Sequence, residues 1–235
     1  MTIEVLFAEV CNLCGDAQNA EYLRQTLPDA ELIFTPLTDR PYFADRTPDM
    51  IYMGNMSEQI QRRVIGALRP YKDRLQTLID GGTVMLFTGN AGETLMKHIS
   101  YVTEEIELDG LGLLDFTVTT DWFKRYNGKT LGKCGDLDVL GFRSQFSMVY
   151  GDNAENAFLK VERGIGLNPE SRLEGVRMNN LFCTALLGPI LPNNPLFTEY
   201  LISLTGQTAK AAFRPQAMDA YEQRLKEFRD PKTEF

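Results

Sequence analysis

The sequence contains a single histidine, His98, among its 235 residues. Zinc sites and Ser-His-Asp triads are built around imidazole groups, so either kind of site would depend on that one residue. Cysteine is scarce too, with Cys11, Cys14, Cys134 and Cys183 as its only occurrences. Four cysteines are too few for a disulfide scaffold in a chain of this length, and reduced thiols are typical of the cytosol.

Positive charge is also in deficit, since 24 Lys and Arg residues against 32 Asp and Glu residues give a net charge of −8. Nucleic-acid-binding domains usually need a basic face, so we expect no nucleic-acid partner. No apolar run approaches the roughly 18 residues of a membrane-spanning helix, and residues 1–7 have a strand-like pattern with no signal peptide before it. We therefore expect a cytoplasmic protein that does not contact the membrane.

The first half of the chain alternates apolar segments with amphipathic ones, as a globular α/β domain does. A hydrophobic content of 43% and a charged content of 24% agree with a well-packed core. The pattern predicts strands over 3–9, 30–36, 50–53 and 83–87, helices over 19–27 and 57–79 with a break near Pro70, and a further helix over 93–99, directly after the turn at 88–90.

After residue 100 the apolar pattern changes to short segments with period two, which indicates antiparallel strands. Turns are expected between them at Asn127-Gly128, Gly135-Asp136 and Gly151-Asp152-Asn153. Strands are predicted over 116–120, 139–142, 147–149, 157–161 and 176–183, followed by helices over 195–204 and 215–228. We expect residues 1–205 to form one domain. Residues 206–235 are expected to form a helical tail packed on that domain through Tyr221, Leu225 and Phe228.

Six short blocks, in a fixed order between residues 1 and 205, are the most specific signal in the sequence. They are Asn12-Leu13-Cys14-Gly15-Asp16, Met53-Gly54-Asn55, Leu111-Gly112-Leu113-Leu114-Asp115, Gly141-Phe142, Glu174-Gly175 and the segment from Thr184 to Pro195. Together they resemble the CobB/CobQ-like (cobyric acid synthase type) class I glutamine amidotransferase domain and, within it, the glutaminase subunit of lipid II isoglutaminyl synthases. The resemblance implies a flavodoxin-like three-layer α/β sandwich. Its central sheet would be mostly parallel, with an antiparallel extension.

The reactive groups of that family are missing at the matching positions. The family uses a cysteine at a strand-to-helix elbow to attack the side-chain amide of glutamine, with a histidine as the base. Here the elbow is Phe87-Thr88-Gly89-Asn90, so Thr88 takes the nucleophile-equivalent position and Leu187 takes the base-equivalent position. A threonine hydroxyl without a neighbouring base is almost never ionised at pH 7, so we expect ordinary glutaminase chemistry to be lost.

The elbow can keep a binding role without its nucleophile, because backbone N–H groups bind anions whatever the side chain. By resemblance, the ligand would be glutamine or another small carboxylate, and the partner would be a Mur-ligase-like synthetase. No metal or cofactor is expected. The expected ligand-binding residues are Gly54, Asn55, Gly89, Asn90, Arg143 and Gln145.

Three hypotheses for function remain open at this stage. The first is a noncatalytic subunit that binds a ligand or a partner. The second is an active amidotransferase subunit that supplies ammonia to a cobalamin precursor or a peptidoglycan precursor. The third is a different hydrolase that uses Thr88 or Cys183. We interpret Cys11 and Cys14 as structural, and His98, expected on the helix after the elbow, as a residue without a catalytic role.

Overall fold

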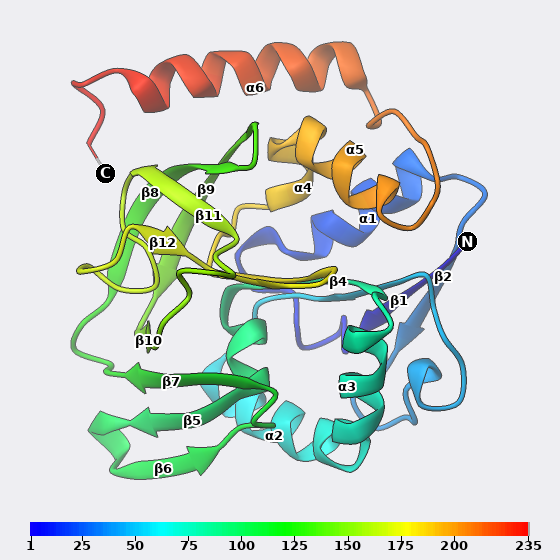
Figure 1. Cartoon of the computed structure of the whole chain (residues 1–235), viewed down its shortest axis with the longest axis vertical. Helices are drawn as coiled ribbons and strands as arrows, with labels where there is room; N and C mark the ends of the chain where they lie inside the picture. The colour runs from blue at the N-terminus through cyan, green and yellow to red at the C-terminus, as the bar shows by residue number, and fades with distance from the viewer. Residues whose placement is uncertain (235) are drawn as a thin grey trace.

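The computed structural model describes residues 1–234 and has a six-stranded sheet at its centre (Figure 1). The strands, in chain order, are β1 (Thr2–Leu6), β2 (Glu31–Thr35), β3 (Met50–Met53), β4 (Val84–Thr88), β13 (Val176–Met178) and β14 (Leu181–Thr184). Their order across the sheet is β13-β14-β4-β3-β1-β2, and every neighbouring pair except β13–β14 is parallel. Every residue of β3 and β4 is buried, as is typical of the central strands of a covered parallel sheet.

The register of the parallel strands brings four of their carboxyl ends to one edge of the sheet. Leu6 pairs with Met53, Met53 pairs with Phe87, and Thr88 pairs with Thr184. In open α/β sheets this edge is where ligands bind. The elbow at residues 88–90 therefore lies in the position that the sequence predicted.

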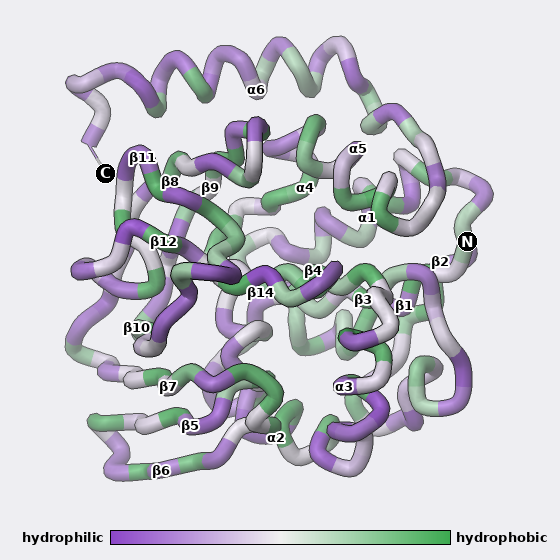
Figure 2. The backbone as a smooth tube through the Cα atoms, viewed as in Figure 1, coloured by the Kyte–Doolittle hydropathy of each residue, from purple (hydrophilic) through white to green (hydrophobic). Residues whose placement is uncertain are grey.

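Helices cover both faces of this sheet (Figure 1). On one face lie α1 (Ala17–Thr26), α4 (Ile190–Asn193) and α5 (Pro195–Ser203), and on the other lie α2 (Glu58–Leu68) and α3 (Lys72–Asp80). The arrangement is the expected three-layer α/β sandwich. Figure 2 shows the largely apolar course of β1, β3 and β4 through its middle.

Local sequence explains how α2 begins and ends. The Ser57 side chain accepts a hydrogen bond from the backbone N–H of Ile60 at 3.4 Å, which caps the first turn. Val64, Ile65 and Leu68 are buried at helical spacing. The expected break near Pro70 is confirmed, because a 3₁₀ turn over Arg69–Tyr71 separates α2 from α3.

The antiparallel strands of the second half form two further four-stranded sheets. One has the order β10-β7-β5-β6, and the other has the order β12-β11-β8-β9. Within the first, only the β5–β7 pair is parallel. The eight strands are β5 (Met96–Tyr101), β6 (Ile106–Asp109), β7 (Leu114–Thr120), β8 (Tyr126–Cys134), β9 (Leu137–Gln145), β10 (Ser147–Tyr150), β11 (Leu159–Arg163) and β12 (Leu173–Glu174).

The expected helix over 93–99 is wrong. A 3₁₀ segment, Gly89–Leu95, follows the elbow, and β5 follows it directly. β5 pairs with β6 on one side and with β7 on the other, and these tertiary pairings override the local helical pattern. His98 consequently lies on a strand, where it faces β6.

Two other expectations on secondary structure need correction. Asn127-Gly128, expected to form a turn, lies inside β8, which pairs with β9 along nine residues. The single strand expected over 176–183 is a hairpin, in which β13 and β14 are joined by Asn179 and Asn180, and Asn179 has a φ of 52°. Asparagine tolerates this left-handed conformation better than most residues.

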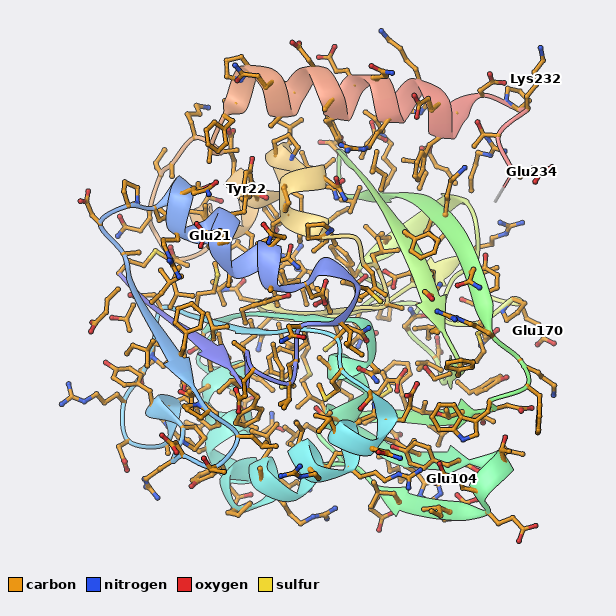
Figure 3. All side chains as sticks on the ribbon, turned by 180° about the vertical axis from the view of Figure 1, so that it is seen from behind. Glu21, Tyr22, Glu104, Glu170, Lys232 and Glu234 are labelled. Atoms are coloured by element: carbon orange, nitrogen blue, oxygen red, sulfur yellow. The ribbon has the colours of Figure 1, made fainter. Side chains whose placement is uncertain are left out.

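The last helix, α6 (Arg214–Arg229), packs against α4, α5 and β9. Tyr221 is buried, and its hydroxyl donates to the carbonyl of Asp138 at 2.7 Å. The hydroxyl of Tyr22 on α1, labelled in Figure 3, donates to the carbonyl of Ala212 at 2.9 Å just before α6. None of the helices within residues 1–234 has both the length and the apolar character needed to cross a bilayer.

Candidate functional site

The elbow changes backbone conformation between Thr88 and Gly89. Thr88 ends β4 in an extended conformation (φ −108°, ψ 153°), whereas Gly89 has a φ of +60° in the left-handed region. The Thr88 side chain is fully buried, and its hydroxyl donates to Oδ2 of Asp16 at 2.6 Å. The hydroxyl at the nucleophile-equivalent position is therefore held inside the protein.

Asp16 fastens three loops at the carboxyl edge of the sheet. Besides the Thr88 hydroxyl, its carboxylate accepts the backbone N–H of Asn55 at 2.8 Å and the amide N–H of Asn19 at 3.3 Å. The Tyr52 hydroxyl donates to the backbone carbonyl of Asp16 at 2.9 Å. Burial raises the pKa of Asp16 to about 6, although the bonds from Thr88 and Asn55 act in the opposite direction. This motif residue thus acts as a structural brace beneath the elbow.

Asn55 fills the space above Gly89. Its Oδ1 accepts the backbone N–H of Asn90 at 3.1 Å, and the side chain of Asn90 in turn bonds both backbone groups of Met56 at 3.0 and 2.8 Å. A Cβ atom at Gly89 would lie 2.5 Å from Cγ of Asn55, and closer still to its Oδ1. The place where an elbow side chain would project is therefore occupied.

A cavity of about 140 Å³ lies beside this elbow. A single water needs only roughly 10–15 Å³ by this measure, so the cavity can hold a small organic ligand. Of the residues expected at the site, Asn55, Gly89, Asn90, Gln145 and Leu187 line it. The other lining residues are Leu13, Cys14, Met56, Ser57, Glu58, Glu93, Arg125, Ser144, Phe146, Ser147 and Ala185.

Three of the expected site residues do not line this cavity. Thr88 lies beneath it, as described above. Gly54 packs so closely on the loop before α1 that a Cβ would collide with the carbonyl oxygen of Cys11. Arg143 is buried, and its guanidinium donates to the carbonyls of Ile165, at 3.0 Å, and Gly166.

Arg143 lines a separate, smaller cavity of about 20 Å³ next to the first. Burial lowers the pKa of Arg143, and the nearby Glu174 carboxylate partly offsets that effect. Glu174 is itself tied down, because it accepts the Thr184 hydroxyl at 3.0 Å and the Ala185 N–H at 2.8 Å. These contacts indicate that Arg143 holds the loop between β11 and β12 in place, which is a structural role that its motif position did not reveal.

The charged groups of the larger cavity are Glu58, Glu93 and Arg125, which the sequence did not single out as ligand contacts. Glu93 is 6% exposed, and its carboxylate accepts the Ser147 hydroxyl and, at 2.8 Å, the amide of Gln61. Burial raises the pKa of Glu93 to about 7, and the charge of Glu58 adds to the rise. Burial also raises the pKa of Glu58. The sequence offered one indication that Glu58 belongs to the site, since it follows the Met53-Gly54-Asn55 block by three residues.

Leu187 occupies the base-equivalent position with an apolar side chain. It is 1% exposed, and its backbone exchanges two hydrogen bonds with Phe142, at 2.7 and 3.2 Å. The histidine of the chain is elsewhere, because the two ring nitrogens of His98 contact Glu107 at 2.6 Å and Asp109 at 3.0 Å on the β5–β6 hairpin. The cavity is thus lined by an apolar side chain where a base would stand.

Only one of the four free cysteines, Cys14, is exposed, and it lines the cavity. Its Sγ accepts a hydrogen bond from Nδ2 of Asn55 at 3.6 Å. Cys183 is buried beside Glu174, and burial raises the pKa of its thiol. Within residues 1–234, no group of three or more His, Cys, Asp and Glu side chains is arranged to hold a metal ion.

The raised pKa of Glu93 predicts a pH-dependent stability. A carboxyl with a pKa of about 7 in the folded protein, against an ordinary value of 4.5, binds protons more tightly when folded. Its contribution to stability is therefore greatest at acidic pH and is lost as the pH rises from about 4.5 through 7. The Glu93→Gln variant should lose less stability than the wild type between pH 5 and pH 8, by about 2 kcal/mol or roughly 4–8 °C in Tm. Equal pH slopes in thermal unfolding of the two proteins would contradict this assignment.

Comparison with known proteins identifies one relative by sequence and several by fold. No protein-family model matches the chain. The chain is 27% identical over 223 residues to subunit GatD of the glutamine-hydrolysing lipid II isoglutaminyl synthase of Staphylococcus aureus (strain N315), a match that covers 93% of this chain and 90% of that subunit.

Solved structures show the same fold at low sequence identity. A glutamine amidotransferase matches with a TM-score of 0.58 and 15% identity over 87% of this chain and 99% of its own. A chain of PurLQS from Thermotoga maritima matches with a TM-score of 0.52 and 13% identity over 95% of this chain and 98% of its own. A second glutamine amidotransferase, also from Thermotoga maritima, matches with a TM-score of 0.51 and 8% identity over 97% of this chain and 91% of its own. The chain therefore has the class I glutamine amidotransferase fold.

Proposed function

We propose that this chain is a CobB/CobQ-type amidotransferase-like subunit that has no glutaminase activity and binds a small ligand at the elbow cavity. The observation that carries the proposal is the geometry of Gly89. A nucleophile elbow is a sharp, strained turn, and the residue with the strained left-handed backbone here is Gly89, not Thr88. We assign the nucleophile position to Gly89, which has no side chain and whose outward space is filled by Asn55.

Two further features support the loss of activity. Thr88 cannot reach a ligand in the cavity without first breaking its bond to Asp16. Leu187 offers no group that can accept a proton. Thioester chemistry needs a nucleophile and a base within hydrogen-bond reach of each other, and neither is supplied at these positions.

The cavity itself is suited to a small carboxylate ligand such as glutamine. Arg125 lines the cavity and supplies positive charge for a carboxylate. We further propose a Mur-ligase-like synthetase as the partner and the cytoplasm as the location. The relative from Staphylococcus aureus is named as a synthase subunit, and the four free cysteines suit a reducing compartment.

A second candidate function, an active glutaminase subunit, is favoured by one observation. Cys14 places an exposed thiol in the cavity, which the carboxylates of Glu58 and Glu93 also line. In that case Cys14 would be the nucleophile in place of the elbow residue. The two candidates differ in whether removal of this thiol matters.

The test is ammonia release from L-glutamine by the purified protein, alone and with a synthetase that copurifies with it. We expect no release above the buffer control from the wild type or from the Cys14→Ser variant, because no reactive pair is assembled. Turnover that disappears in Cys14→Ser would replace our proposal with the second candidate. Turnover that persists in Cys14→Ser would contradict both candidates, because it would require a nucleophile that neither of them names.

A further inference from the structure

The larger cavity has an uneven distribution of charge. Glu93, which is 6% exposed, lies at its closed end, while Glu58 is half-buried and Arg125 is exposed. Negative charge therefore lies deep in the cavity and positive charge lies near its mouth. A ligand that matches this layout carries its own charges in the reverse order.

The arginines near the two carboxylates do not contact them directly. Arg143 acts on Glu93, and Arg62 and Arg125 act on Glu58, through longer-range charge interactions that lower the pKa of each carboxyl. Within residues 1–234, neither Glu58 nor Glu93 forms an ion pair with a lysine, an arginine or the histidine. The hydrogen bonds from Ser147 and Gln61 use one acceptor site on each oxygen of Glu93, and an ionised carboxylate offers about four such sites. Burial outweighs these distant charges, since the pKa of each carboxyl is still raised, and a cation in direct contact would reduce the cost of burial.

We propose that the cavity binds an amino acid with a cationic side chain, whose side-chain ammonium contacts Glu93 and Glu58 and whose carboxylate faces Arg125. An ammonium donates three hydrogen bonds, which the free acceptor sites of the two carboxylates can receive. This inference rests on the proposed noncatalytic ligand pocket and names its ligand class. It replaces the neutral amide of glutamine with a charged group at the elbow end.

Three amino acids of matched length separate this ligand class from its alternatives. L-ornithine, L-glutamine and L-glutamate differ chiefly in the charge at the side-chain end. In isothermal titration at pH 8, we expect L-ornithine to bind at least about tenfold more tightly than either of the others, as one charged hydrogen-bonded contact allows. The affinity for L-ornithine should fall by up to about tenfold between pH 8 and pH 6, because the pKa of Glu93 is about 7 and its protonation removes the negative charge.

Two variants and one control locate the ammonium. Glu93→Gln and Glu58→Gln should each weaken L-ornithine binding by about tenfold or more, and Glu93→Gln should also remove the pH dependence. Glu58 lies on the first turn of α2 and is half-buried, so its variant remains informative if Glu93→Gln does not fold. Glu170→Gln is the matched control, because Glu170 (Figure 3) is exposed on a loop and does not line the cavity.

Several results would overturn the proposal. They are tighter binding of L-glutamine or L-glutamate, no binding of any of the three, unchanged L-ornithine affinity in both Glu93→Gln and Glu58→Gln, and equal displacement of L-ornithine by Mg²⁺ alone. The ammonia assay is independent of all of them. Ammonia release would contradict the proposed function, whereas tight L-glutamine binding without release would contradict only the ligand class inferred here.

Discussion

Replacing Gly89 with alanine is expected to destabilise the protein by about 2–5 kcal/mol. Part of this loss comes from the backbone, because a φ of +60° is unfavourable for any residue that has a Cβ. The rest comes from overpacking, since the new Cβ would lie 2.5 Å from Cγ and 2.6 Å from Cβ of Asn55. The loss is measured as the change in the free energy of unfolding in urea.

A matched control separates the two contributions. Gly135 has a φ of +58°, and a Cβ added there meets no atom within 4 Å. Gly135→Ala should therefore lose only the backbone contribution of about 1–2 kcal/mol. In an Asn55→Gly background, the cost of Gly89→Ala should fall to a similar value. Equal losses for Gly89→Ala and Gly135→Ala in the wild-type background would show that Asn55 does not occupy the elbow space.

A cysteine placed at position 88 is expected to stay unreactive, whereas one placed at position 89 becomes reactive once Asn55 is removed. The comparison uses Thr88→Cys and the double variant Gly89→Cys with Asn55→Gly, each in a Cys14→Ser background that removes the exposed native thiol. Alkylation by iodoacetamide is followed by intact mass. The thiol at position 88 should react at least about a hundredfold more slowly, since it must wait for a local opening that costs roughly 3 kcal/mol.

The buried native thiols serve as internal controls, and a double variant at positions 88 and 187 tests the same geometry by activity. The native thiols of Cys11, Cys134 and Cys183 are buried and should also remain unmodified. Because the side chain at position 88 faces Asp16, Thr88→Cys combined with Leu187→His should release no ammonia from glutamine. Rapid alkylation at position 88, or ammonia release by that double variant, would move the nucleophile position back to Thr88.

The sequence was sufficient to predict the layers of the fold and the edge at which the site lies. Short continuous apolar runs such as Met50–Met53 are typical of buried parallel strands, and the glycine after such a run marks the turn at its carboxyl end. It was not sufficient for residues 93–101. The segment from Met96 has both helical and strand-like spacing, and its partners in β6 and β7 come from later in the chain.

The site was predicted in part, for a similar reason. The motifs predicted that Asn55, Gly89 and Asn90 belong to the site, and in the structure the backbone N–H of Asn90 donates to the side chain of Asn55. The charges of the cavity come from three distant segments, at Glu58, Glu93 and Arg125, and only the folded chain shows that they share one space. The motif also could not show that the elbow residue is Gly89, because backbone φ is not visible in the sequence.

The most direct test of an inert elbow is a single-turnover experiment, in which excess protein is mixed with labelled L-glutamine and quenched over time. We predict that all label is recovered as free glutamine, with no glutamate and no glutamyl group on the protein. Label bound covalently to Cys14 or to any residue of the elbow, or a burst of glutamate, would contradict the account, because either result requires a nucleophile that this arrangement does not provide.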